Sequence, residues 1–92
     1  MKLQLERGSI DLTAFDQDIR QVLEELFLLI NVSYAMPPEV DGAVTVDLHH
    51  APYQEALDMI LGERFTFHID LHNVIHIHKR GTTWLPGNPH ID

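Results

Sequence analysis

Histidine is the residue type in this sequence with the clearest capacity for chemistry. Seven histidines occur in 92 residues, and three of them fall in two alternating runs on either side of a short loop. His68 lies in the first run, and His76 and His78 lie in the second. The runs predict a hairpin. If Phe67 and Ile75 share its core face, the register places the three histidines together on the opposite face.

This histidine face has two interpretations. Side chains two apart on one strand lie roughly 7 Å apart, so His76 and His78 could chelate a metal ion with His68 across the ladder, and Asp70 could add an oxygen. The alternative is a solvated outer face that tolerates imidazole as a polar group. We favour the solvated face, because no His-x-x-x-His helix pair and no thiolate accompanies these histidines. We therefore expect no metal and no cofactor.

No catalytic constellation is visible in the sequence. The chain contains no cysteine, and its serines, Ser9 and Ser33, fall in expected strands without a nucleophile elbow. No glycine-rich loop is present to hold phosphate. The acidic residues of the expected helices are typical of a solvated face, and nothing predicts an apolar pocket around one of them. We therefore expect that the protein is not an enzyme.

Composition narrows the class of partner. Six basic residues against 14 acidic residues give a net charge of −8, which argues against nucleic acid and against insertion into an anionic membrane, because both favour clustered Lys and Arg. The length suits one domain. No apolar run approaches the roughly 20 residues that span a bilayer. The first residues also lack the apolar stretch of a signal peptide, so we expect a cytoplasmic protein if Met1 is the native start and otherwise a fragment of a longer precursor.

Hydrophobic periodicity predicts the elements that position these residues. An amphipathic helix follows Asp16 as its N-cap, carries Asp18 in its first turn and is closed by Asn31. A second helix begins at Pro52 and stops at Gly62. Alternation predicts strands at 9–13, 32–36, 44–48, 65–69 and 74–78. The fold class is therefore α+β, in the order β-α-β-β-α-β-β.

Five motifs follow one another along the chain: Ser9-Ile-Asp-Leu, Asp18-Ile-Arg-Gln-Val-Leu, Pro38-Glu-Val-Asp-Gly-Ala-Val-Thr-Val-Asp-Leu, Ala51-Pro-Tyr-Gln-Glu-Ala-Leu-Asp-Met-Ile-Leu and Asn73-Val-Ile-His-Ile. This ordered set resembles the short N-terminal (STN) domain shared by bacterial secretins and TonB-dependent receptors. The resemblance covers about residues 8–79. It implies a domain at 8–80, in which two helices pack with a two-stranded and a three-stranded sheet, followed by a linker or loosely docked tail at 81–92.

The resemblance also implies a function and a location. It implies a periplasmic, non-enzymatic docking module that is part of a longer outer-membrane protein. In secretins this domain sits at the mouth of an outer-membrane ring and meets inner-membrane machinery. In TonB-dependent receptors it passes a signal to an anti-sigma regulator.

The end of the first expected helix departs from the family pattern. The run Leu26-Phe27-Leu28-Leu29-Ile30 is apolar where the family usually has polar residues. Five successive apolar residues cover every direction of a helix turn, so they cannot all face one core. We therefore predict a contact patch of Phe27, Leu28 and Leu29, whose acidic neighbours Glu24 and Glu25 orient the partner. The alternative is that loops or the Trp84-Leu85 tail cover the run.

We expect a docking module of an outer-membrane secretin in a secretion or pilus system. Its partners would be other protein subunits, an inner-membrane component or a regulator, and self-association is a further expectation. Open strand edges could add a partner strand through main-chain hydrogen bonds. The alternatives are a receptor signalling domain that contacts an anti-sigma regulator and, in another class, a histidine-based metal-binding domain.

Overall fold

Two three-stranded sheets and two helices make up the part of the chain that the structure, a computed structural model, describes, which is residues 1–79. Sheet A contains β1 (Lys2–Glu6), β2 (Ser9–Asp18) and β4 (Ala43–Pro52), with β2 in the middle and antiparallel to both neighbours. The alternation of buried and exposed residues along β2 and β4 gives this sheet one core face and one solvent face.

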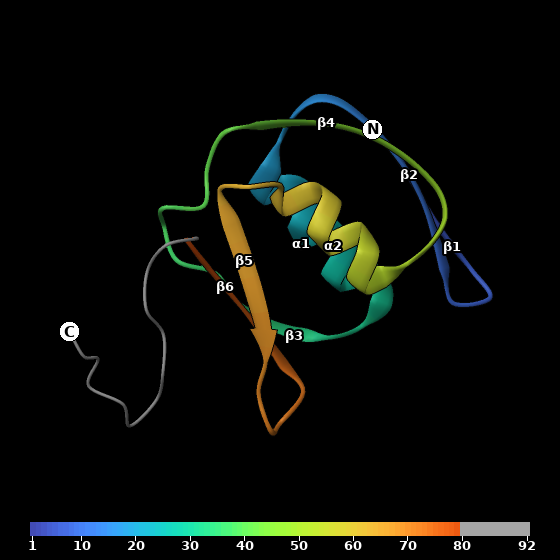
Figure 1. Ribbon diagram of the computed structural model, residues 1–92. Coiled ribbons are helices and arrows are strands. Elements are labelled where there is room, and N and C mark those ends of the chain that lie inside the picture. Colours follow the sequence, from blue (N-terminus) through green and yellow to red (C-terminus); the bar gives the residue numbers. More distant parts are fainter. Residues whose placement is uncertain (80–92) are drawn as a thin grey trace, which may run out of the picture.

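Sheet B contains β3 (Ser33–Ala35), β6 (Val74–Lys79) and β5 (Phe65–Ile69), with β6 in the middle. β5 and β6 form the antiparallel hairpin that the sequence predicts, and β3 lies parallel to β6. In Figure 1 the two helices lie side by side, with sheet A curving past them on one side and sheet B on the other.

Helix α1 (Ile19–Ile30) and helix α2 (Tyr53–Leu61) supply apolar stripes to one shared core. Asn31 closes α1 in the left-handed conformation at φ 60°, as predicted, and Gly62 closes α2. The largest side chains with less than 2% exposure come from both sheets, both helices and the loop before β4: Phe27, Ile10, Leu12, Leu23, Leu26, Leu57, Ile75, Val22 and Val40.

The fold class predicted from the sequence is confirmed, but the predicted number of strands in one sheet is wrong. The expected two-stranded sheet has three strands, because β1 pairs with β2 through the register Leu3 with Leu12 and Leu5 with Ile10. Arg7 and Gly8 connect the two strands at φ 53° and φ 81°. Two positive φ angles in a two-residue loop are what a type I′ turn requires. The alternation of the first six residues is therefore a strand signal.

The predicted cap of the first helix is also wrong. Asp16 lies within β2 at a positive φ of 52°, where the pairing with β4 is irregular, and its N–H donates to Thr45 Oγ1 at 3.0 Å. Strand pairing continues as far as Asp18, so the helix begins two residues later than expected. Asp18 is the N-cap, and its Oδ1 accepts a hydrogen bond from the N–H of Arg20 at 3.2 Å.

No helix within residues 1–79 combines the length and the hydropathy that a membrane crossing requires. The expected tail at 81–92, including the Trp84-Leu85 cover, lies outside the described residues.

Candidate functional site

The C-terminal end of α1 divides its apolar run between the core and the surface. Leu28 is 82% exposed and Leu29 is 37% exposed, whereas Phe27 is completely buried. The ring of Phe27 stacks on Tyr34 with centroids 4.8 Å apart. The sequence prediction is therefore wrong for Phe27, because helical spacing turns this ring toward sheet B and the core. Among its apolar members, the predicted contact patch retains Leu28 and Leu29.

The exposed leucines lie beside the edge strand of sheet A. Met1, Leu3, Glu25, Leu28 and Leu29 line a depression between β1 and α1, which we call the β1–α1 groove. The side chains that line it are apolar except that of Glu25, whose Oε2 accepts a 3.3 Å hydrogen bond from Gln21. The structure thus brings two of the predicted apolar contact residues and one predicted acidic neighbour to a single groove. Glu24 is exposed on the same helix.

The main chain of β1 adds a second feature to this groove. In a hairpin with a two-residue loop, the residues that flank the turn form a hydrogen-bonded pair. Glu6 and Ser9 are that pair, so the alternation of an antiparallel ladder directs the N–H and C=O groups of Leu3 and Leu5 away from β2. The strand order leaves that side of β1 at the edge of sheet A. An incoming strand could bind there through main-chain hydrogen bonds.

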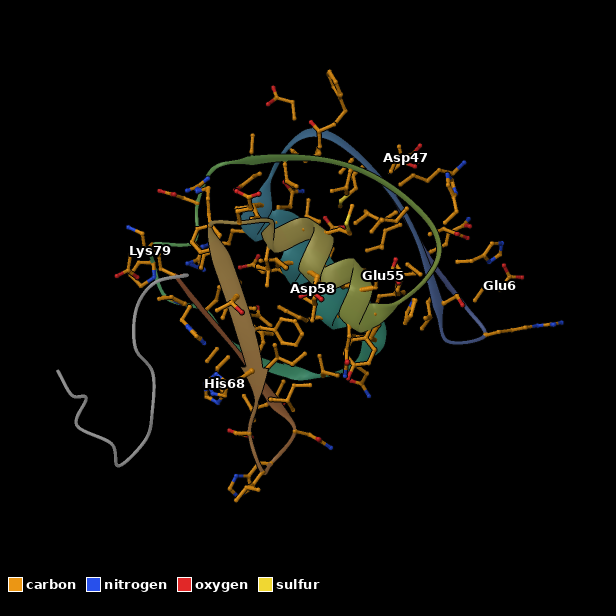
Figure 2. The ribbon with its side chains drawn as sticks, in the orientation of Figure 1. Glu6, Asp47, Glu55, Asp58, His68 and Lys79 are labelled. Carbon is orange, nitrogen blue, oxygen red and sulfur yellow. The ribbon has the colours of Figure 1, made fainter. Side chains whose placement is uncertain are left out.

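The three hairpin histidines share one face, as the sequence predicts. His68 is directly opposite His76 in the ladder, and their rings stack in nearly parallel planes with centroids 4.7 Å apart. The rings of His68 and His78 are 5.3 Å apart at an angle of 53°. Figure 2 shows His68 on the side of β5 that faces away from the helices.

This histidine cluster does not have the geometry of a metal centre. The lone pairs of imidazole lie in the plane of the ring, so two stacked rings do not direct their nitrogen atoms toward a common point. No group of three or more His, Cys, Asp or Glu residues in the part of the chain that the structure describes is arranged to hold a metal ion. The cluster does, however, affect the protonation of His68. Burial, followed by the neighbouring charges of His76 and His78, lowers the pKa of His68 below its ordinary value.

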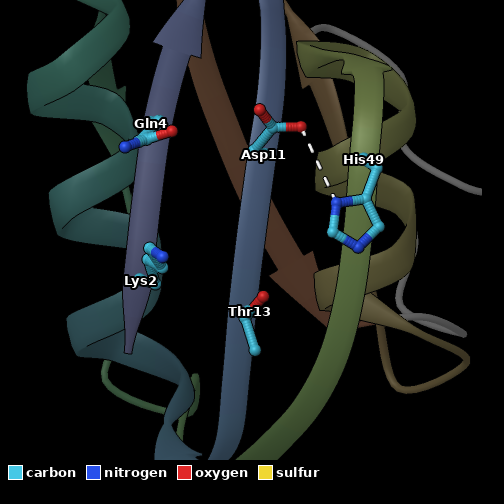
Figure 3. Close-up of a pocket in the computed structure, with 5 residues that line it drawn as sticks. All are labelled: Lys2, Gln4, Asp11, Thr13 and His49. Atoms are coloured by element: carbon cyan, nitrogen blue, oxygen red, sulfur yellow. Dashed lines mark ion pairs between the residues drawn. The ribbon is translucent and has the colours of Figure 1, made fainter.

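The outer face of sheet A carries a cluster of one histidine and two aspartates that the sequence analysis did not predict. His49 on β4 lies between two carboxylates, with Nε2 3.1 Å from Asp47 Oδ1 and Nδ1 3.9 Å from Asp11 Oδ1. Figure 3 shows the side chain of His49 on the same face of the sheet as Asp11, Thr13 and the β1 residues Lys2 and Gln4. This cross-strand arrangement depends on the pairing of β1, β2 and β4, which local patterns do not determine.

A bulge in β4 sets the place of His49. Leu12 pairs with Leu48 and Ile10 pairs with Ala51, so His49 and His50 together lie opposite Asp11. His50 has a positive φ of 56°, and its N–H donates to Asp11 Oδ1 at 2.9 Å. Such a bulge inserts one residue into one strand and redirects the neighbouring side chains. The carboxylate of Asp11 therefore has a structural role in holding the bulge.

The other strongly exposed apolar side chains lie at separate places. Leu71 is completely exposed in the loop between β5 and β6, Phe15 is 77% exposed next to the irregular step of β2, and Met59 is 52% exposed on α2. Each is a single side chain, which needs no functional explanation. The β1–α1 groove combines several apolar side chains with a strand edge, and it is therefore our candidate site.

Comparison with known proteins places the fold. No protein-family model matches the sequence, and the search of curated proteins finds no match. Among solved structures, the N0 domain of the type II secretin from enterotoxigenic Escherichia coli superposes with a TM-score of 0.67 and 17% sequence identity. The match covers 83% of this chain and 99% of the other. The chain is thus similar in fold to a secretin N0 domain, and at this identity the likeness concerns the fold alone.

Proposed function

We propose that this chain is a non-enzymatic periplasmic docking domain of a secretin-type outer-membrane assembly, and that it binds a neighbouring protein subunit through the β1–α1 groove. The observation that carries the proposal is the 82% exposed side chain of Leu28, which lines a groove together with other apolar side chains next to the edge strand β1, in a fold similar to a secretin N0 domain. Burying one leucine side chain contributes about 1.5–3 kcal/mol. Covering Leu28 could therefore supply a substantial share of the binding free energy of a weakly bound partner.

Charge gives the groove a preference for one kind of partner. The groove is lined by the carboxylate of Glu25, with Glu24 exposed on the same helix, and the chain as a whole has a net charge of −8. A partner segment that presents apolar side chains flanked by Lys or Arg therefore fits best. Such pairing sets orientation and association rate more than affinity, and it weakens as salt shortens the screening length to about 8 Å.

Site-specific photo-crosslinking in the native cell tests this proposal. A photoreactive amino acid is placed at position 28 of the intact protein, and a matched one at position 59, where Met59 is an exposed apolar residue on the other helix. We expect position 28 to crosslink to another subunit of an envelope assembly and position 59 not to do so. Leu28→Lys should remove a crosslink formed from position 29.

The identity of the captured protein decides among the alternatives. Capture of an inner-membrane component of a secretion or pilus system supports the proposal. Capture of an anti-sigma regulator would replace the secretin assignment with a receptor signalling domain. If position 28 captures no protein other than the chain itself, or if positions 28 and 59 capture the same proteins equally, docking through this groove is wrong.

A further inference from the structure

Strand β1 has a free edge, and its sequence is complementary to that of a second, antiparallel β1. Within residues 1–79, β1 pairs with β2 alone, and the main-chain groups of Leu3 and Leu5 point outward, as shown above. An added antiparallel strand must therefore form its hydrogen-bonded pairs with these two residues. That requirement limits the registers in which a second β1 could bind.

We propose that β1 pairs with β1 of a second copy of this chain, antiparallel about a two-fold axis that passes beside Gln4. In this register Leu3 lies opposite Leu5 of the second copy, which joins the residues whose N–H and C=O groups face outward. Gln4 lies opposite Gln4, and Lys2 lies opposite Glu6 of the second copy. The proposal goes beyond the proposed function and does not depend on it: it assigns the free edge of β1 to a second copy and leaves the Leu28 and Leu29 side chains of the β1–α1 groove to a docking partner.

The alternative symmetric registers are poorer. Moving the axis to Leu3 or to Leu5 keeps the hydrogen-bonding parity but shortens the overlap of the five-residue strand to three residues. It also removes the pairing of Lys2 with Glu6. The register centred on Gln4 uses the whole strand and sets opposite charges directly across from each other at two symmetric places. Opposite-charge pairs at such positions stabilise a ladder, and like charges there destabilise it.

The two faces of the paired β1 strands differ: one is polar and faces solvent, and the other is apolar and faces the core. Lys2 and Gln4 lie on the outer, solvent-facing side of sheet A (Figure 3), so the Lys2–Glu6 contacts form in water at the surface. Leu3 and Leu5 point to the core side, where Leu5 is 41% exposed in the single chain. Pairing places each of these leucines beside a leucine of the other copy. One continuous six-stranded sheet results, and the edge of β1 is covered.

Pairing also concerns the β1–α1 groove. A two-fold axis perpendicular to the sheet keeps the core faces of both copies on the same side. The Leu28–Leu29 ends of the two α1 helices therefore lie on the same face of the joined sheet, one on each side of the new seam. A partner protein would meet two apolar patches instead of one, which raises avidity without any new type of contact.

Charge reversal at the two ends of β1 tests the register. Lys2→Glu places two carboxylates opposite each other, and Glu6→Lys places two ammonium groups opposite each other, so each variant alone should raise the dissociation constant of the dimer by about tenfold or more. An equimolar mixture of the two variants restores opposite charges at both places. The double variant Lys2→Glu/Glu6→Lys restores them within one chain.

The measurement is sedimentation velocity over a range of concentrations, on the full 92-residue chain with any affinity tag at the C-terminus. We expect a reversible dimer for the unchanged chain and for the double variant, weaker dimers for each single variant, and recovery in the mixture. Glu55→Lys on α2 (Figure 2) makes the same change in charge as Glu6→Lys away from β1 and should dimerise normally. Circular dichroism checks that every variant is folded.

Several results would overturn the inference. These are a monomeric unchanged chain at every concentration, single variants that dimerise as tightly as the unchanged chain, or a mixture that does not recover. The outcomes are separable from those of the docking proposal. A chain that is monomeric but still crosslinks from position 28 to another envelope subunit contradicts the pairing and leaves the docking function intact.

Discussion

His76 Nε2 lies 2.8 Å from Asp70 Oδ2, across the base of the loop that joins β5 and β6. The other oxygen of the same carboxylate accepts hydrogen bonds from the N–H groups of His72 at 2.7 Å and Val74 at 3.0 Å. The Asp70 carboxylate thus ties the loop to β6 through hydrogen bonds, and Leu71 within that loop is completely exposed. These hydrogen bonds, chiefly the one from His76, lower the pKa of Asp70 from 3.8 to about 2.

The lowered pKa of Asp70 predicts a loss of stability in acid. Because the folded chain holds this carboxyl group ionised more strongly than the unfolded chain does, the stabilisation is present above pH 4 and is lost as the pH falls toward 2. Asp70→Asn keeps a hydrogen-bond acceptor and removes the charge. We expect this variant to have a smaller free energy of unfolding than the unchanged chain at pH 7, and the difference to shrink as the pH approaches 2.

Urea unfolding followed by circular dichroism at a series of pH values measures this difference. Asp58→Asn on the exposed side of α2 removes the same charge without touching the loop and serves as the control. A difference between Asp70→Asn and the unchanged chain that stays constant between pH 4 and 2 would contradict the assignment.

The environment of His68 predicts that its pKa lies below the ordinary value for a histidine. Burial and the neighbouring His76 and His78 disfavour its charged form, so its pKa lies below the ordinary 6.5. The unfolded chain then binds a proton at a higher pH than the folded chain, and the free energy of unfolding falls as the pH drops below about 6.5. The ring-proton shifts in an NMR titration measure the midpoints directly.

Two variants assign the lowered midpoint to His68. His68→Gln should remove it and make the loss of stability below pH 6.5 less steep. His72→Gln, at an exposed position in the loop, should leave it in place. A midpoint for His68 at or above 6.5 would show that burial and the neighbouring imidazoles do not act on it as described.

Adjacent residues of α1 should respond very differently to truncation. Phe27→Ala removes a fully buried ring that stacks on Tyr34, and the cavity should lower the free energy of unfolding by about 3–5 kcal/mol. Leu28→Ala truncates an 82% exposed side chain and should change it by about 0.5 kcal/mol or less. Thermal and urea unfolding measure both values, and equal losses would mean that the division of this apolar run is misassigned.

Local patterns in the sequence determined the elements whose stabilising contacts lie close along the chain. The apolar spacing of α1, its closure at Asn31 and the shared face of the hairpin histidines are all confirmed. Helical periodicity and strand parity are fixed by backbone geometry, so a short window of residues is enough to predict them. Helical spacing also divides the apolar run, because Phe27 lies four residues after the buried Leu23 and Leu28 lies four residues after the exposed Glu24. What this spacing does not show is how far other elements cover each side chain, as Tyr34 covers Phe27.

Contacts between distant segments decided the rest. The pairing of β2 with β4 continues to Asp18 and displaces the start of α1 from Asp16, while the bulge opposite Asp11 places His49 between two carboxylates. The seating of β1 beside α1 turns an exposed leucine into the wall of a groove. Each of these outcomes depends on which strands become neighbours. Which strands become neighbours depends on how the whole apolar core is buried, and a short stretch of sequence is not enough to predict it.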